Sequence, residues 1–127
     1  TADGYVVYGR KVWISTAQVT EKMLLLARTT PLEEVKKPTD GLSLFYTNLD
    51  RRYVDVKEIE KLGRKAVDSN ELFIDNLPIP QEDLIGEEGQ GLAYAQIRLE
   101  GARLFHCMRF IGLASRAMSM ARTRGSN

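Results

Sequence analysis

The chain has 127 residues and a mass of 14.3 kDa, and its 43% hydrophobic content provides enough apolar material for one ordinary core. Its 18 basic and 17 acidic residues leave a net charge of +1, which argues against a dedicated nucleic-acid binder. A lone cysteine, Cys107, excludes an internal disulfide, and no stretch approaches the roughly 20 apolar residues of a membrane span. The composition predicts a cytoplasmic protein or one of an equivalent compartment.

Charge divides the chain near residue 90. Residues 1–90 contain 12 basic and 16 acidic residues, whereas residues 91–127 contain six arginines and one acid, Glu100. The hydrophobic period changes at the same place, from short runs rich in β-branched and aromatic residues to a helical spacing. The sequence therefore predicts two units, a β-rich one over residues 1–90 and a helical one over residues 91–127.

The first unit predicts an antiparallel sheet of five to seven strands. Residues 4–14 indicate a hairpin with a tight turn at Gly9, because glycine readily supplies the positive φ of such a turn. Two apolar runs, residues 23–27 and 42–47, have the length of buried strands, although the period of the first also allows a helical turn. Between them, residues 29–41 carry two prolines and several charges and predict a long exposed loop.

Two further runs complete the expected strands. Residues 53–59 alternate as a half-exposed strand does, and residues 71–77 give another strand. Pro78 and Pro80 are expected to end the sheet, because proline donates no hydrogen bond to a ladder. The predicted fold class is mainly β, an antiparallel β-barrel or sandwich followed by one long α-helix.

The second unit predicts a single long helix from Gly91 onward. One face of this helix would carry residues at steps of four and three: Leu104, Met108, Ile111, Ser115 and Met118. Gly112 costs about 1 kcal/mol relative to alanine inside a helix, so we expect a close helix contact there. Since a helix is stabilised mainly by packing its apolar face, and no other segment matches this one, the sequence suggests a fragment of something larger.

Two groups of residues with potential chemistry favour structural roles. The glycine-rich stretch 86–91 could cradle a phosphate, but Glu87 and Glu88 would repel an anion, so a flexible start to the helix is the favoured interpretation. His106 and Cys107 are neighbours on the helix and point about 100° apart, which excludes a nucleophile and base pair. With one histidine, the chain can build neither a Ser-His-Asp triad nor a multi-histidine metal site.

Two further sets of residues each allow a binding role. Trp13, the only tryptophan, precedes Ile14 and Ser15, so its indole could form a wall for a flat heteroaromatic ring, although a core position is favoured from sequence alone. Glu100 and Arg103 share a helix face and favour an ordinary ion pair. Facing a cleft, the same two side chains could bind a nucleotide or an amide-rich tether.

Four motifs, taken in chain order, resemble the acyl-CoA dehydrogenase family. Residues 4–15 are similar to the family's G-x-Y-x-x-x-G-x-K-x-W-I-[ST] segment, and residues 62–63 to its K-x-G step. Residues 69–80 resemble the strand that ends in isoleucine-proline, and residues 81–91 resemble the stretch P-x-x-x-L-[IL]-G-x-x-G-x-G before the next helix. Because the four motifs cover nearly the whole chain in the right order, the resemblance is specific.

This resemblance implies the middle β-barrel domain of the family for the first unit, and the first helix of an incomplete C-terminal all-α domain for the second. It implies FAD as the cofactor, with Trp13, Ile14 and Ser15 against the flavin, where an indole can pack on the ring and a hydroxyl can bond its polar edge. It also implies that Glu100 and Arg103 line the acyl-CoA site.

The resemblance further implies an oxidoreductase. Family members remove an α-proton and a β-hydride from an acyl-CoA thioester, which gives a trans-2-enoyl-CoA, and electrons usually pass to an electron-transfer flavoprotein. The catalytic base is usually a late glutamate, or in some relatives the residue just before the arginine of the first helix, which here is Ala102. No catalytic residue is therefore assigned to this chain, and a dimeric or tetrameric parent is expected.

A second hypothesis belongs to another functional class. The same β domain could act as a binding or assembly module that keeps the family's architecture without its redox chemistry. A tryptophan that contributes to flavin affinity would distinguish the enzyme from this module.

Overall fold

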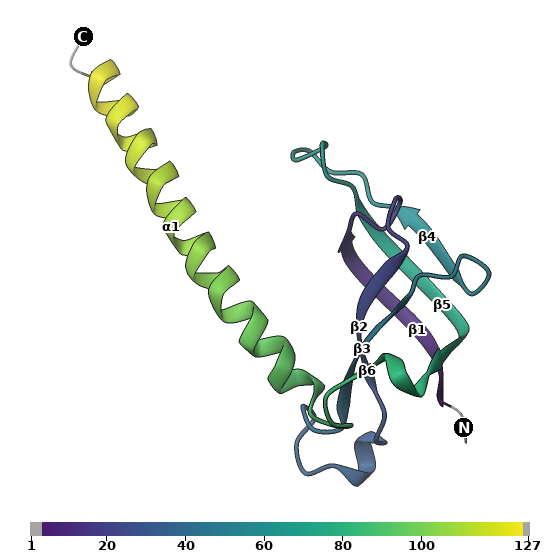
Figure 1. Ribbon diagram of the computed structural model, residues 1–127. Coiled ribbons are helices and arrows are strands. Elements are labelled where there is room, and N and C mark those ends of the chain that lie inside the picture. Colours follow the sequence, from purple (N-terminus) through teal and green to yellow (C-terminus); the bar gives the residue numbers. More distant parts are fainter. Residues whose placement is uncertain (1–3, 126–127) are drawn as a thin grey trace. The chain divides into compact units, whose positions relative to one another are not determined.

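The computed structural model describes residues 4–125 and divides into two compact units, residues 1–92 and 93–127. Two short 3-10 turns interrupt the loops of the first unit, η1 (Leu32–Glu34) and η2 (Gln81–Asp83). The strands are β1 (Gly4–Ser15), β2 (Lys22–Arg28), β3 (Leu42–Asn48), β4 (Val54–Glu58), β5 (Ser69–Pro80) and β6 (Leu84–Ile85), and one helix follows, α1 (Gly91–Gly125) (Figure 1). The mainly β fold class with a long C-terminal helix is confirmed.

The strands form two antiparallel sheets of three strands each. In the first sheet β5 lies between β1 and β4, and in the second β3 lies between β2 and β6. No ladder joins the two sheets within the described residues, so β1 and β2 each have one open edge. The predicted loop over residues 29–41 is also present; it contains η1 and extends away from the strands (Figure 1).

The inward faces of the two sheets share one apolar core. Phe45 of β3 is fully buried and meets Leu25 of β2 and Leu72 of β5 in the same cluster. Each such side chain contributes about 1.5–3 kcal/mol relative to remaining in water. The other buried members of the cluster are Ala17, Met23, Leu49, Val54, Ile74, Leu77 and Ile79.

An irregularity in β5 keeps its apolar residues on the core side along the whole strand. Leu72 and Ile74 are buried, and so are Leu77 and Ile79, although the odd interval between Ile74 and Leu77 would put the second pair on the opposite face of a regular strand. Asn76 adopts a left-handed φ of 53° at this point, where the register with β1 also shifts. The extra residue therefore restores the inward face, as a β-bulge does.

The predicted hairpin over residues 4–14 is wrong. These residues form one continuous strand, β1, whose ladder partner is β5, more than fifty residues further along the chain. Gly9 does adopt a positive φ, 147°, but it lies beside a register shift between Val7 and Gly9. The conformational freedom of this glycine serves an irregularity within a long strand, which sequence alone does not distinguish from a turn.

The prediction that Pro78 and Pro80 end the sheet is also wrong. Both lie within β5, opposite Val6 and Gly4 of β1. The ladder between β4 and β5 covers only Asn70–Ile74 of β5, so the last part of β5 has β1 on one side and an open edge on the other. A proline whose missing N–H faces an open edge removes no ladder bond.

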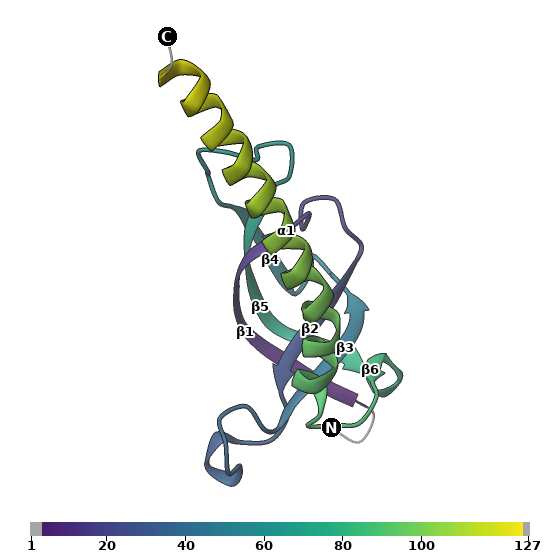
Figure 2. The same cartoon turned by 90° about the vertical axis from the view of Figure 1, so that its left-hand side faces the viewer.

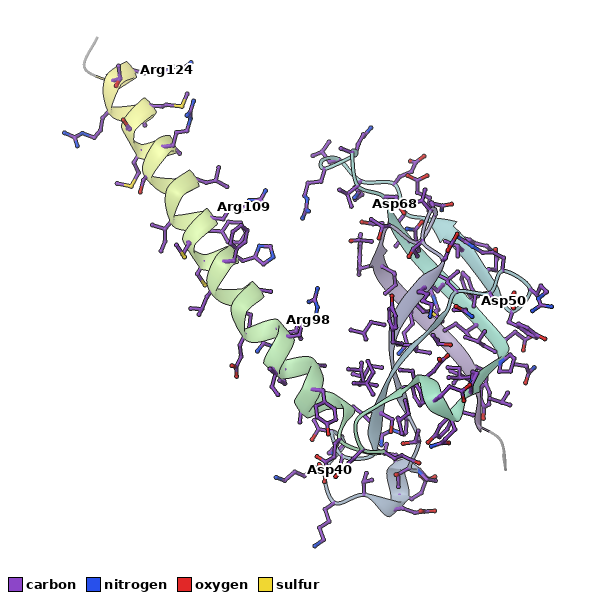
Figure 3. The ribbon with its side chains drawn as sticks, viewed as in Figure 1. Asp40, Asp50, Asp68, Arg98, Arg109 and Arg124 are labelled. Atoms are coloured by element: carbon purple, nitrogen blue, oxygen red, sulfur yellow. The ribbon has the colours of Figure 1, made fainter. Side chains whose placement is uncertain are left out.

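Most of helix α1 is exposed: Gly91 is its one buried residue, and the half-buried ones are Leu92, Tyr94, Ala95, Gln96 and Ala102. The helix is unbroken in the views of Figures 2 and 3, and Figure 3 shows Arg98, Arg109 and Arg124 spread along it. A Cβ added at Gly112 would meet nothing within 4 Å, so the close contact predicted there is not present in the described structure. Across residues 4–125, no helix has the combination of length and apolar character that crossing a membrane requires.

Candidate functional site

Trp13 occupies a β-bulge near the end of β1. Lys11 pairs with Leu72 and Ile14 pairs with Asn70, so two residues of β1, Val12 and Trp13, stand opposite a single residue of β5. Trp13 has a φ of 64°, in the left-handed region that a bulky side chain seldom adopts. Its side chain is 66% exposed, so the core position favoured from sequence alone is wrong.

The two residues after Trp13 have different environments. Ile14 is half-buried and packs against the core cluster, whereas Ser15 ends β1 with an exposed side chain. The chain then turns at Thr16, which has a φ of 60° and whose carbonyl accepts hydrogen bonds from the backbone N–H groups of Val19 and Thr20, both at 3.2 Å. Of the three predicted flavin contacts, Trp13 and Ser15 therefore present side chains to solvent, and Ile14 supports them from the core side.

A buried amide joins this segment to β5. Asn70 is fully buried, its Nδ2 donates to the carbonyl of Ile14 at 3.0 Å, and its Oδ1 accepts from Nε2 of Gln18 at 2.8 Å. Asp68, just before β5 (Figure 3), accepts from Nδ2 of Asn70 and from the backbone N–H of Gln18. The hydrogen bond from Asn70 is the main cause that lowers the pKa of Asp68. These hydrogen bonds hold Ile14 and Gln18, in the segment that follows Trp13, to Asp68 and Asn70.

A half-buried lysine lies on the other side of the bulge. The Nζ of Lys11 donates to the carbonyl of Leu26 in β2 at 2.7 Å and thereby links the open edges of β1 and β2. Burial lowers the pKa of Lys11. The lysine borders a cavity of about 200 Å³ whose other walls are apolar: Ile14, Met23, Leu24, Leu25, Leu26 and Leu72.

Sequence reasoning missed Lys11 and Asn70, although the strand pattern carried a signal for both. Asn70 is two residues from Leu72, so a polar residue there occupies an inward position of an otherwise apolar strand face. Lys11 likewise lies four residues from Val7 on the half-buried face of β1. Polar groups at inward positions need fixed partners, and both have them here.

The glycine-rich stretch before α1 is anchored by specific contacts. A Cβ on Gly91 would lie 2.4 Å from the backbone nitrogen of Leu44, so only glycine fits where the helix begins against β3. The N–H of Gly89 donates to Oγ of Ser43 at 2.8 Å, and Gln90 bridges to Leu42. These contacts tie residues 89–91 to β3, and the N–H of Gly89 is already used within the protein.

The predicted substrate residues lie on α1. Glu100 and Arg103 are both exposed, and within residues 4–125 no ion pair joins them, so the structure does not show the ordinary pair predicted as the simpler alternative. Ala102 between them is half-buried and has no ionisable group. Both charged side chains remain accessible for a ligand.

Other residues of α1 show no assembled site. Cys107 is exposed with a free thiol, and the ring of His106 lies 6.4 Å from that of Phe105 and 6.3 Å from that of Phe110. Nowhere in residues 4–125 do three His, Cys, Asp or Glu side chains gather as metal ligands.

The geometry first defines a structural class of protein. It is an antiparallel two-sheet domain that leads into a long helix and displays an exposed tryptophan on a strained bulge. Residues 1–77 match the family described as "Acyl-CoA dehydrogenase, middle domain". The chain belongs to the acyl-CoA dehydrogenase family.

Curated relatives and solved structures agree with this assignment. The chain is 31% identical over 121 residues to the short-chain-specific acyl-CoA dehydrogenase of Clostridium acetobutylicum, covering 94% of this chain and 31% of that protein. It is 32% identical over 120 residues to the cyclohex-1-ene-1-carbonyl-CoA dehydrogenase of Syntrophus aciditrophicus, covering 94% and 28%. The structure of an acyl-CoA dehydrogenase from Geobacillus kaustophilus matches with a TM-score of 0.75 and 31% identity, covering 82% of this chain and 27% of that one. The chain thus spans less than a third of the length of each of these relatives.

Proposed function

We propose that this chain is part of an FAD-dependent acyl-CoA dehydrogenase that oxidises an acyl-CoA thioester to a trans-2-enoyl-CoA. Family membership and the similarity to the relatives named above support the proposal. In this proposal residues 1–90 form the middle domain and residues 91–127 the first helix of the following all-α domain. Since position 102 is alanine, the catalytic base comes from outside these residues.

One observation carries the cofactor assignment: Trp13 is exposed and fixed in a strained conformation. Burial in the core would explain a large aromatic side chain, but here two-thirds of its surface is open. Planar apolar surface suits a flavin ring, and the exposed Ser15 adds a hydroxyl that can donate to or accept from polar edge atoms. When bound, FAD would supply the hydride acceptor. The residues present therefore fit the group.

For the substrate, we assign Glu100 and Arg103 to the acyl-CoA side. Arg103 can donate to carbonyl or phosphate oxygens, and Glu100 can accept from amide or hydroxyl groups. They lie three positions apart on α1 and therefore share one face of the helix. Neither of them is assigned as the base.

The proposed parent protein has further partners. We assign an electron-transfer flavoprotein as the electron acceptor and a homo-oligomer, dimer or tetramer, as the assembly. We place the protein in the cytoplasm, or in the mitochondrial matrix if it is eukaryotic. The long-chain-specific relative from Rattus norvegicus, 32% identical over 101 residues, is named as mitochondrial.

The experiment that tests the cofactor assignment replaces Trp13 in the intact parent protein. Trp13→Leu keeps apolar bulk but removes the aromatic plane, so we expect FAD to bind about tenfold more weakly, which is 1.4 kcal/mol. Tyr8→Leu is the matched control, because Tyr8 is an aromatic residue of the same strand and is 78% exposed. Equal FAD dissociation constants for the Trp13 variant, the control and the wild type would refute the assignment.

A further inference from the structure

The bulge that carries Trp13 is held from both sides by polar side chains. We propose that Lys11 and Asn70 are positioning residues that keep Trp13 in its left-handed conformation and so orient the indole for the flavin. The inference rests on the proposed function for its flavin half, whereas its conformational half concerns residues 1–92 alone.

The strain at Trp13 requires such support. A bulky residue with a φ of 64° lies outside its preferred backbone regions, and such residues persist where the surroundings over-determine them. Trp13 itself supplies little packing in return, because 66% of its side chain is exposed. The constraint must therefore come from neighbouring residues in the chain and in the sheet.

Asn70 provides the constraint after the bulge. Its Nδ2 bonds to the carbonyl of Ile14, the residue that it also opposes in the ladder, at 3.0 Å. Its own amide is fully buried and is held by Gln18 at 2.8 Å and by Asp68, so it has little freedom to move. The peptide immediately after Trp13 is thereby fixed to β5.

Lys11 provides the constraint before the bulge. It lies two residues ahead of Trp13, and its Nζ bonds to the Leu26 carbonyl at the open edge of β2 at 2.7 Å. The bond spans a place where the two sheets have no ladder, so a side chain does what backbone pairing does elsewhere. Together the two contacts fix both ends of a segment of two residues, Val12 and Trp13.

Stability alone does not account for these two residue types. Lys11 borders a cavity whose other walls are apolar and Asn70 is fully buried, and at such positions a hydrophobic residue of similar volume is often as stabilising as a buried polar or charged group. A polar group at such a position does contribute direction, because a hydrogen bond fixes its acceptor in a way that an apolar contact does not. A strained and exposed tryptophan needs neighbouring hydrogen bonds that fix the orientation of its backbone.

The conformational half is tested by NMR on the 127-residue chain. A positive φ brings the amide proton of a residue close to its own Hα, so wild-type Trp13 should give a strong intraresidue cross-peak and one indole N–H signal. In Lys11→Met and in Asn70→Ala we expect that cross-peak to weaken and the indole signal to broaden or split. Lys11→Arg, which keeps a donor, should restore the wild-type pattern, and Lys36→Met, an exposed lysine of the 29–41 loop, is the control.

Retained amide dispersion of the core residues Phe45 and Leu72 shows that a variant is folded. If Asn70→Ala fails to fold, Lys11→Met and Lys11→Arg carry the test. A folded Lys11→Met chain whose Trp13 signals match the wild type would overturn the inference.

The flavin half is tested by the FAD affinity of the intact parent carrying the same variants. Lys11→Met should weaken FAD binding about tenfold, by analogy with the loss of affinity when a residue that supports a metal ligand is replaced. Lys11→Arg should recover most of this loss, and Lys36→Met should show none. Loss of the Trp13 conformation with unchanged FAD affinity would contradict the flavin role of Trp13, and with it the proposed function, while the conformational half would stand.

Discussion

The φ angle of Trp13 decides whether its side chain is buried or exposed. In a regular strand, alternation would give Val12 and Trp13 opposite faces, and one of them would lie in the core. The left-handed φ of Trp13 leaves both exposed and returns Ile14 to the core side. Residue type alone predicts a buried tryptophan, whereas the backbone conformation of Trp13 leaves its side chain exposed.

The network beside Trp13 should respond to acid through Asp68. Because the pKa of Asp68 is lowered in the folded chain, chiefly by the bond from Asn70, its contribution to stability is present above the ordinary value of 3.8 and is lost as the pH falls through the lower folded value. An NMR titration should show the Gln18 amide signal shifting in that acid range. Asp68→Asn should abolish this shift, and a midpoint at or above 3.8 in the wild type would contradict the prediction.

At the scale of elements, the sequence predicts most strands well and their partners poorly. The runs at residues 23–27, 42–47 and 53–59 correspond to β2, β3 and β4, because local hydrophobic patterns mark single strands. The pairing of β1 with β5 joins segments far apart in the chain, and no local pattern encodes it. For the same reason the sequence predicts a turn at Gly9 and a stop at Pro78, where the structure has a strand irregularity and an open edge.

The residues of the candidate site also divide into those that the sequence predicts and those that it does not. Trp13, Ser15, Glu100 and Arg103 could be named from motifs, because each motif is local. The roles of Lys11 and Asn70 could not, since each depends on an acceptor that another segment supplies, Leu26 of β2 or Ile14 of β1. The strand pattern marks both residues as polar at inward positions, but the acceptor that fixes each of them is visible only after the sheets are assembled.

The start of α1 should not tolerate even a methyl side chain at position 91. Gly91→Ala places a Cβ 2.4 Å from the nitrogen of Leu44 and 2.5 Å from the carbonyl carbon of Ser43, and neither backbone atom can yield easily. We expect a loss of about 1–3 kcal/mol in the free energy of unfolding, measured by urea denaturation.

The matched control for this prediction is Gly101→Ala. A Cβ there meets nothing within 4 Å, so alanine should stabilise the helix by about 0.5–1 kcal/mol and raise its circular dichroism signal. Equal effects of the two alanines would show that Gly91 is not packed as described.

At the scale of the whole molecule, the chain consists of a β unit with a core and a helix with almost no buried residues. Cooperative stability should therefore reside in residues 1–92. Net charge follows the same division, with the acidic excess in the β unit and six arginines in the helix. The two units should respond differently to substitutions in the core.

Phe45→Ala tests this division. The side chain is fully buried and makes an edge contact with Tyr5, with ring centroids 4.9 Å apart, so its loss should cost about 3–5 kcal/mol in the β unit. The fluorescence of Trp13, which reports on β1, should then change at much lower urea, while the far-ultraviolet circular dichroism of α1 should change little. Coincident shifts of both signals would show that the helix and the sheets unfold together.

The central claim is that this chain is part of a flavin-dependent enzyme that oxidises acyl-CoA. Visible absorption spectroscopy of the intact parent protein tests this claim most directly. The measurement records the flavin band as purified, and then after anaerobic addition of saturated acyl-CoAs of different chain lengths. We expect a flavin band that bleaches with one class of acyl chain. A colourless protein that cannot be reconstituted with FAD would contradict the claim and favour a β module without redox chemistry.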